Sequence, residues 1–201
     1  MDFTKTKKNL EKRGFAVSCF ETAAEAAAYL DGVTNGKTVG FGGSVTLDQM
    51  GLYESLATHN NVFWHWRERD GMTAKQLRDA GNAAEIYLSS VNGLSENGEI
   101  INIDGTCNRV AATLYGHERV FLVAGKNKIA ADYEAALWRA RNVAAPLNAK
   151  RLGAKTPCAV KGDRCYNCES EGRICRALSV LWEKPMGLAV EVVLINEDLG
   201  Y

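Results

Sequence analysis

The residues from Glu118 to Leu152, ERVFLVAGKNKIAADYEAALWRARNVAAPLNAKRL, carry the clearest indication of the fold class. Its first part, 118–125, contains a run of apolar residues that ends in a glycine, which is typical of a strand buried on both faces. The remainder, 127–152, predicts one long helix interrupted near Pro146, because a proline removes a backbone donor from a helix. A buried strand that leads into a helix is the repeating unit of a parallel sheet covered by helices.

The same alternation continues on both sides of this stretch. We expect strands within 37–44, 61–66, 84–95 and 187–200, and helices up to Gly14 and over 21–32, 46–56, 71–81 and 107–116. Segment 97–106 predicts a hairpin arm, because an Asn-Gly turn is followed by alternating apolar residues. Segment 189–195 is apolar at both sets of alternate positions, which predicts a last strand inside the main sheet. The pattern therefore predicts an α/β fold with a largely parallel sheet covered on both faces.

The composition restricts the classes of function. The chain has 201 residues, 46% of them hydrophobic, which suits one domain with a sizeable core. Lys plus Arg and Asp plus Glu number 24 each, and this balance gives no support for a nucleic-acid partner. No apolar stretch is long enough for a membrane span, and the first residues lack the apolar core of a signal peptide. We therefore expect a cytoplasmic protein.

Four of the six cysteines are gathered in a short segment, in the spacing C-x6-C-x2-C-x6-C: Cys158, Cys165, Cys168 and Cys175. In a reducing compartment, clustered cysteines hold a metal or perform chemistry more often than they form disulfides. Segment 156–176 has almost no large apolar residues, so it cannot fold by burying itself. We expect it to be an insertion before the last strand that binds metal. Spacing alone leaves a structural zinc, a [4Fe–4S] cluster and metal-free thiols open.

Small, polar and charged residues follow several of the expected strands. The ends of parallel strands meet at one edge of a sheet, where α/β proteins commonly bind ligands. The candidate residues for binding a small anion are Gly42, Gly43, Ser44, Asn92, Asp104, Gly105, Asn108, Arg109, Lys126 and Lys128.

Each group of candidates also has a structural interpretation. Arg109 can hold a carboxylate or phosphate with two donors, or it can form a surface salt bridge while Asp104 caps a helix. The paired glycines 42–43 can bring backbone amides close to an anion, or they can only shape a tight turn. The two lysines of GKNK, 125–128, can add positive charge to the same site or can be solvated in a loop.

The histidines are weaker candidates. His65 lies in an expected strand and reads as a packed side chain, whereas His59 and His117 lie in polar contexts and are expected to be solvated. No combination of nucleophile and base can be argued from spacing. The sequence therefore gives no candidate catalytic residue.

Several phrases of the sequence resemble one family. They are FGGS at 41–44, NGEIINIDGTCNRVAA at 97–112, FLVAGKNKI at 121–129, AAPLNAKRLGAKTPC at 144–158 and NEDLG at 196–200. Together with the cysteines, they resemble the LUD (lactate-utilisation) domain family over essentially the whole chain. One departure is Cys107, which stands where this motif often has glycine.

The resemblance implies one LUD-type domain over 1–201 with a three-layer α/β fold similar to ribose-phosphate isomerases and coenzyme A transferases. It also implies kinship with the small subunit of a three-component system that oxidises lactate to pyruvate, whose companion subunits carry iron–sulfur clusters. This context favours a [4Fe–4S] cluster over zinc and a role in electron transfer. The alternatives are a non-catalytic ligand-binding or assembly subunit stapled by zinc, and an isomerase or transferase, for which fold analogy alone speaks.

Overall fold

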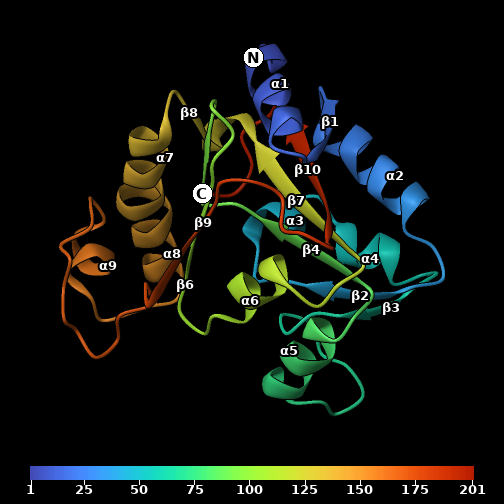
Figure 1. Cartoon of the computed structure of the whole chain (residues 1–201). Coiled ribbons are helices and arrows are strands. Elements are labelled where there is room, and N and C mark those ends of the chain that lie inside the picture. Colours follow the sequence, from blue (N-terminus) through green and yellow to red (C-terminus); the bar gives the residue numbers. More distant parts are fainter.

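The computed structural model describes residues 1–201, and its centre is a six-stranded parallel sheet (Figure 1). The strand order is β1-β10-β7-β4-β2-β3. The bounds are β1 Ala16–Phe20, β2 Thr38–Phe41, β3 Asn61–Phe63, β4 Ile86–Ser90, β7 Arg119–Gly125 and β10 Ala189–Ile195. Every neighbouring pair is parallel. The expected largely parallel sheet is therefore present.

The two faces of this sheet bury two separate apolar clusters. Along β7, Val120 and Leu122 pack into one cluster, whereas Phe121 and Val123 pack into the other. β10 divides its residues in the same way. Because side chains alternate along a strand, a strand that is apolar at every position is covered on both sides. The last strand thus lies inside the main sheet, between β1 and β7, as the sequence predicts.

Helices supply the cover on both faces, which fits the expected layered α/β architecture. α2 (Ala23–Val33), α3 (Val45–Gln49) and α4 (Leu52–Leu56) lie on one face. α1 (Thr4–Lys12) and α6 (Asn108–Leu114) lie on the other, and α5 (Ala74–Asn82) packs beside β2 and β3. α2 and α5 each begin with a reciprocal capping box, which satisfies free backbone amides of the first turn.

A second, four-stranded sheet was only partly predicted. Its order is β8-β5-β6-β9, with bounds β5 Gly93–Ser95, β6 Ile100–Asp104, β8 Ile129–Ala130 and β9 Ala177–Leu181. β5 and β6 form the expected antiparallel hairpin, and Gly98 has a φ of 99° in its turn. The strands that were not predicted, β1, β8 and β9, are short or half exposed, so they lack the continuous apolar run of a buried strand.

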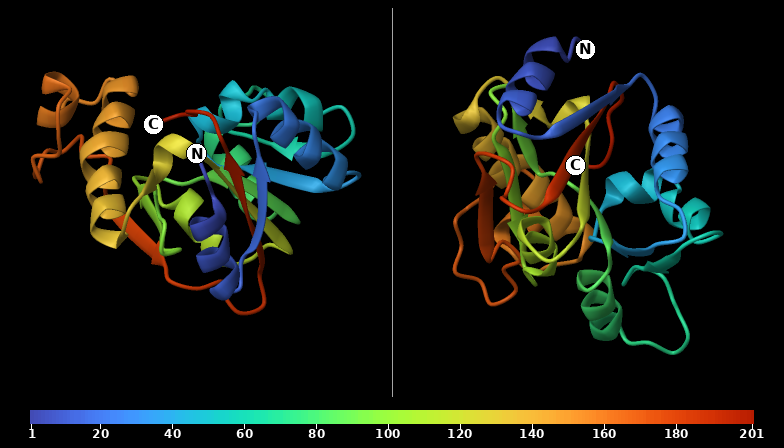
Figure 2. Two further views of the ribbon diagram at one scale, coloured as in Figure 1. Left: turned by 90° about the horizontal axis from the view of Figure 1, so that it is seen from above. Right: turned by 45° about the vertical axis from the view of Figure 1, so that its right-hand side comes forward.

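The expected long helix over 127–152 is wrong at its start. Residues Lys126–Lys128 form a 3-10 turn (η1) and β8 follows, so the helix begins only with α7 (Tyr133–Arg139). Ala140–Ala144 (η2) is a π-helical stretch, and α8 (Ala145–Arg151) continues after it. The irregularity lies just before Pro146, where the missing backbone donor favours a departure from regular α-helix. α7, η2 and α8 together cover the outer face of the second sheet (Figure 2).

The cysteine segment follows α8. It contains α9 (Pro157–Lys161) and then runs without regular structure to β9. Figure 1 shows it at the outer side of α8, away from the six-stranded sheet. No helix of the structure combines the length and apolar character that crossing a membrane requires.

Two glycines allow the closest approach between α5 and the sheet. A Cβ atom at Gly40 in β2 would lie 2.1 Å from the carbonyl oxygen of Gly81 in α5. We expect Gly40→Ala to lower the free energy of unfolding by about 1–3 kcal/mol, because two backbones would have to separate. Urea denaturation of the purified protein measures this effect.

Gly32→Ala is the matched control. Gly32 lies in α2 with no atom within 4 Å of the added Cβ. This change should raise the free energy of unfolding by about 0.4–1 kcal/mol, because alanine loses less backbone freedom on folding. Equal effects of the two substitutions would show that α5 does not pack against β2 in this way.

Candidate anion-binding site

A cavity of about 490 Å³ lies at the ends of the central parallel strands. Its floor comes from the segments that follow β2, β3 and β4, and from the end of β6 and the start of α6. α8 and residues 173–176 of the cysteine segment form the opposite wall. The cavity thus lies at the edge of the sheet where the sequence predicts a ligand site.

The structure brings eight of the ten predicted residues to this one cavity. They are Gly43, Ser44, Asn92, Asp104, Gly105, Asn108, Arg109 and Lys128. The other two, Gly42 and Lys126, do not line it. Gly42 lies directly below the cavity, because a Cβ there would be 3.0 Å from the stem of Arg109 and from the hydroxyl of Ser89. Because Gly42 has no side chain, the stem of Arg109 fits beside it.

Arg109 is engaged more fully within the protein than the sequence suggests. Its Nη1 donates to the carbonyl oxygen of Ser90 at 3.2 Å and to Oδ1 of Asn102 at 2.5 Å. Its Nη2 donates to Oδ1 of Asn92 at 3.0 Å and to the carbonyl oxygen of Ile103 at 2.6 Å. The alternative interpretation of Arg109, a surface salt bridge, is wrong, and both terminal nitrogens are used inside the fold. Burial lowers the pKa of the guanidinium, and the Asp104 carboxylate opposes that shift.

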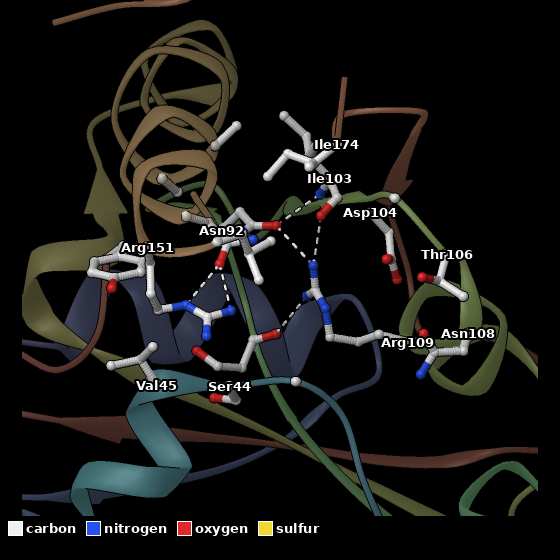
Figure 3. A pocket seen from close by; sticks show the side chains of 18 of the residues that line it. Ser44, Val45, Asn92, Ile103, Asp104, Thr106, Asn108, Arg109, Arg151 and Ile174 are labelled. Atoms are coloured by element: carbon white, nitrogen blue, oxygen red, sulfur yellow. Dashed lines mark hydrogen bonds between the residues drawn. The ribbon is translucent and has the colours of Figure 1, made fainter. Parts of the chain in front are cut away.

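Asn92 is oriented by these contacts. Its Oδ1 accepts from Arg109 and also from the backbone amide of Ile103 at 2.8 Å. Because two donors hold the oxygen, the amide nitrogen must point the other way. No protein acceptor faces that nitrogen, so it is available to donate to a molecule in the cavity. Figure 3 shows Asn92 between Arg109 and Arg151.

Basic side chains dominate the lining. Six of the lining residues are basic, namely Arg78, Arg109, Lys128, Arg151, Arg173 and Arg176, and only Asp104 is acidic. None of these seven takes part in any of the ion pairs of the protein. A concave surface with one sign of charge attracts ligands of the opposite sign.

Two nitrogens of Arg151 are hydrogen-bonded within the protein, and the third is free to donate to a ligand. Its Nε and Nη2 donate to Oδ1 of Asn148 at 3.1 and 2.9 Å, and its guanidinium lies 4.6 Å from the ring centre of Trp66. The stacked arrangement restricts its motion. Nη1 has no partner in the protein. Arg151 and Arg109 reach into the cavity from opposite sides (Figure 3).

Lys128 differs from its neighbour Lys126. Lys128 is only 4% exposed, and its Nζ donates to Oγ of Ser90 at 3.0 Å and to the carbonyl oxygen of Val91 at 3.1 Å. Burial, with Arg139 and Arg109 nearby, lowers its pKa to about 7. Of the two interpretations of these lysines, the solvated one is wrong for Lys128, which lines the cavity, whereas Lys126 is half buried and outside the cavity.

Two predicted residues also serve as helix caps. Asp104 accepts from the backbone amide of Val110 in the first turn of α6, at 3.1 Å. Ser44 accepts from the amide of Leu47 in α3 at 3.2 Å, which leaves its hydroxyl proton free. The structural interpretation of Asp104 as a cap is thus present together with its position in the cavity wall.

The histidine predictions meet with mixed results. His65 is half buried, as expected, but it lines the cavity, and its buried Nδ1 has no partner. Burial lowers the pKa of His65, and the charge of Arg78 lowers it further. His117 is buried, stacks on Tyr87 and contacts the carbonyl oxygen of Ala84 at 2.6 Å, so its expected solvation is wrong.

The four clustered cysteines line one small hollow together. All four are free thiols. Arg173 donates to Sγ of Cys175 at 3.2 Å, and the amide of Asn167 donates to Sγ of Cys165 at 3.3 Å. Hydrogen bonds from Ser170 lower the pKa of Cys168. Such donors stabilise thiolates and metal-bound sulfur. No three His, Cys, Asp or Glu side chains are already arranged around one ion, however.

The hollow and the cavity share a wall. Arg173 and Ile174 line both. A Cβ at Gly105 would lie 2.7 Å from the carbonyl oxygen of Ile174, so the segment rests directly on the β6–α6 turn. The amide of Arg176 donates to the carbonyl oxygen of Asp104 at 2.9 Å. The cysteine segment thus forms part of the cavity wall.

Comparison with known proteins gives one family and one fold. The model of the LUD domain matches residues 3–195. A DUF162 family protein from Deinococcus radiodurans, known from a crystal structure, has a similar fold with a TM-score of 0.53. The two are 12% identical, and the match covers 97% of this chain and 99% of the other. No curated protein sequence matches the chain.

The contacts of Arg109 predict a structural effect. Arg109→Ala would leave four oxygen acceptors without this donor, so we expect a loss of about 1–3 kcal/mol in the free energy of unfolding. The melting temperature should fall by roughly 2–4 °C for each kcal/mol. Differential scanning calorimetry measures both.

Arg151→Ala is the comparison, because this exposed side chain hydrogen-bonds only to Asn148 in its own helix and its one further contact is with the ring of Trp66. It should leave the melting temperature nearly unchanged. An Arg109→Ala protein that melts like the parent would contradict the structural role.

Proposed function

The chain belongs to the LUD domain family, and on this premise we propose that it is a subunit of lactate or related hydroxy-acid utilisation that binds a small anionic ligand in the cationic cavity. The observation that carries the ligand class is the set of basic side chains without acidic partners. The guanidinium groups repel one another across the cavity, and an anionic ligand offsets that repulsion. The proposal includes a cytoplasmic location.

Specific contacts favour a small carboxylate or phosphate. Nη1 of Arg151 has no partner, and the amide nitrogen of Asn92 has no acceptor. The hydroxyl proton of Ser44 is also free, because its oxygen is the cap acceptor. These donors surround one space, which suits a compact anion with several acceptor oxygens. A non-catalytic ligand-binding subunit would need the same contacts.

We further propose that Cys158, Cys165, Cys168 and Cys175 hold one metal centre. Support comes from the shared hollow and from the donors that face Cys165 and Cys175. The thiols would have to converge on binding, because no ion site is preformed. Four cysteinates suit a [4Fe–4S] cluster or zinc, and the lactate-oxidising context favours the cluster. A cluster would supply electron transfer to iron–sulfur partner subunits, whereas zinc would only staple the segment.

Arg151 gives the sharpest test of the anion site. Arg151→Ala removes a charge-assisted contact worth about 1.5–3 kcal/mol, so affinity should fall roughly ten- to a hundredfold. Isothermal titration calorimetry with lactate, pyruvate, phosphate and coenzyme A measures this loss and shows which anion binds.

Arg67→Ala serves as a control of equal charge change. Arg67 is paired with Asp48 and Glu54 and does not line the cavity. It should leave the affinity unchanged. If no anion binds the parent protein, or if both variants bind equally, the cavity is not the ligand site.

The metal centre is tested by single cysteine substitutions. Each of Cys158→Ser, Cys165→Ser, Cys168→Ser and Cys175→Ser should lower metal content and raise protease sensitivity between Thr156 and Arg176, because metal binding orders a segment with little core. Anaerobic purification followed by metal analysis and a visible spectrum distinguishes a coloured iron–sulfur protein from a colourless zinc protein.

Cys19→Ser is the control, because Cys19 lies in the edge strand β1 far from the segment. It should change neither property. Full metal content in all four single mutants would rule out a shared centre.

A further inference from the structure

Lys128 is a buried amine in the cavity wall that forms no ion pair. It follows β7, the strand at the middle of the fold, and lines the cavity beside Ser90. Its Nζ has two acceptors, Oγ of Ser90 and the carbonyl oxygen of Val91. A neutral amine uses its two N–H groups for these acceptors and keeps its lone pair.

The surroundings favour the neutral amine. The charged groups that act on Nζ are the guanidinium groups of Arg109 from α6 and Arg139 from α7. No carboxylate pairs with Lys128, and Asp198 acts on Arg139. Burial among cations disfavours an ammonium ion, so the pKa falls to about 7. Lysines placed in this way act as nucleophiles at neutral pH.

We propose that Lys128 forms an imine with an anionic carbonyl compound bound in the cavity, of which the 2-oxo acids are the smallest class. The inference rests on the proposed anion site and adds to it a covalent step. The carboxylate would be held by the donors of Arg151 and Asn92, and the carbonyl carbon would face Nζ.

The step balances without a further reactant. The lone pair of Nζ attacks the carbonyl carbon, and the carbonyl oxygen takes up the first proton of the amine to give a carbinolamine. Loss of that oxygen as water, with the second proton of the amine, gives the C=N bond. Oγ of Ser90, 3.0 Å from Nζ, is placed to accept and return protons.

The same residue would behave differently as a structural tether. An ammonium group that only binds Ser90 and Val91 would stabilise the fold, and it would not react with carbonyl compounds. Lys126 gives a matched comparison, because it lies in the same 3-10 turn but outside the cavity.

Borohydride trapping tests the imine on the full chain. The protein is incubated with pyruvate and reduced with sodium cyanoborohydride, and intact mass and peptide mapping locate the product. We expect one reduced pyruvate adduct, on Lys128. Lactate, which has the same charge but no carbonyl group, should give none, and acetone, which lacks the carboxylate, should give far less.

The pH dependence and two variants complete the test. The trapping rate should fall as the pH drops below about 7, because protonation removes the lone pair. A lysine with an ordinary pKa of about 10.4 would instead gain reactivity up to that pH. Lys128→Met should abolish the adduct, whereas Lys126→Met should retain it.

The outcomes separate this inference from the anion site itself. Calorimetric binding of pyruvate without an adduct on Lys128 would overturn the imine and leave the anion site standing. An adduct spread over several lysines, or one that persists in Lys128→Met, would also overturn it. Failure of every anion to bind would remove both. Peptide mapping of the parent decides the matter even if Lys128→Met does not fold.

Discussion

The guanidinium of Arg109 is the interaction on which the arrangement of the site depends. It leaves α6 and bonds to the end of β4, to the segment after β4 and to two residues of β6. β4 belongs to the parallel sheet and β6 to the second sheet, so one side chain fixes the two sheets to each other. Gly42 leaves space for its stem. Because multiple charge-assisted bonds hold a planar group in one orientation, Asn92 is also fixed, with its amide nitrogen facing the cavity.

Much of the fold could be predicted because burial leaves a clear pattern in the sequence. β7 and β10 are apolar on both faces and were recognised, whereas β1 and β9 are half exposed at sheet edges and were not. The long helix was misjudged at its start, since Lys126–Ala130 form a turn and a two-residue strand that no periodicity reveals. Short elements that depend on tertiary contacts have little signal of their own.

The residues on the floor of the cavity could be predicted from the sequence, whereas those on its opposite wall could not. Loops after parallel strands meet by topology, so Ser44, Asn92 and Asp104 could be grouped in advance. Arg151 and Arg173 come from α8 and the cysteine segment, which return over the cavity only in the folded chain. The signal available for Arg151 was its spacing from Asn148 on one helix face, and that spacing is equally common on solvated helices. The burial of Lys128 could not be predicted either, because a lysine between Asn127 and Ile129 after a strand is equally consistent with a solvated position.

The position of Arg173 has a mechanical consequence. Its guanidinium bonds to Cys175 and to the carbonyl oxygen of Cys168, while its side chain also borders the cavity. If a metal draws the thiols together, as proposed, Arg173 either moves with the segment or loses these hydrogen bonds. Because the same side chain lines the cavity, the positive charge that a ligand would meet there would change with the position of Arg173. Arg173 is thus a direct connection between the cysteine segment and the cavity.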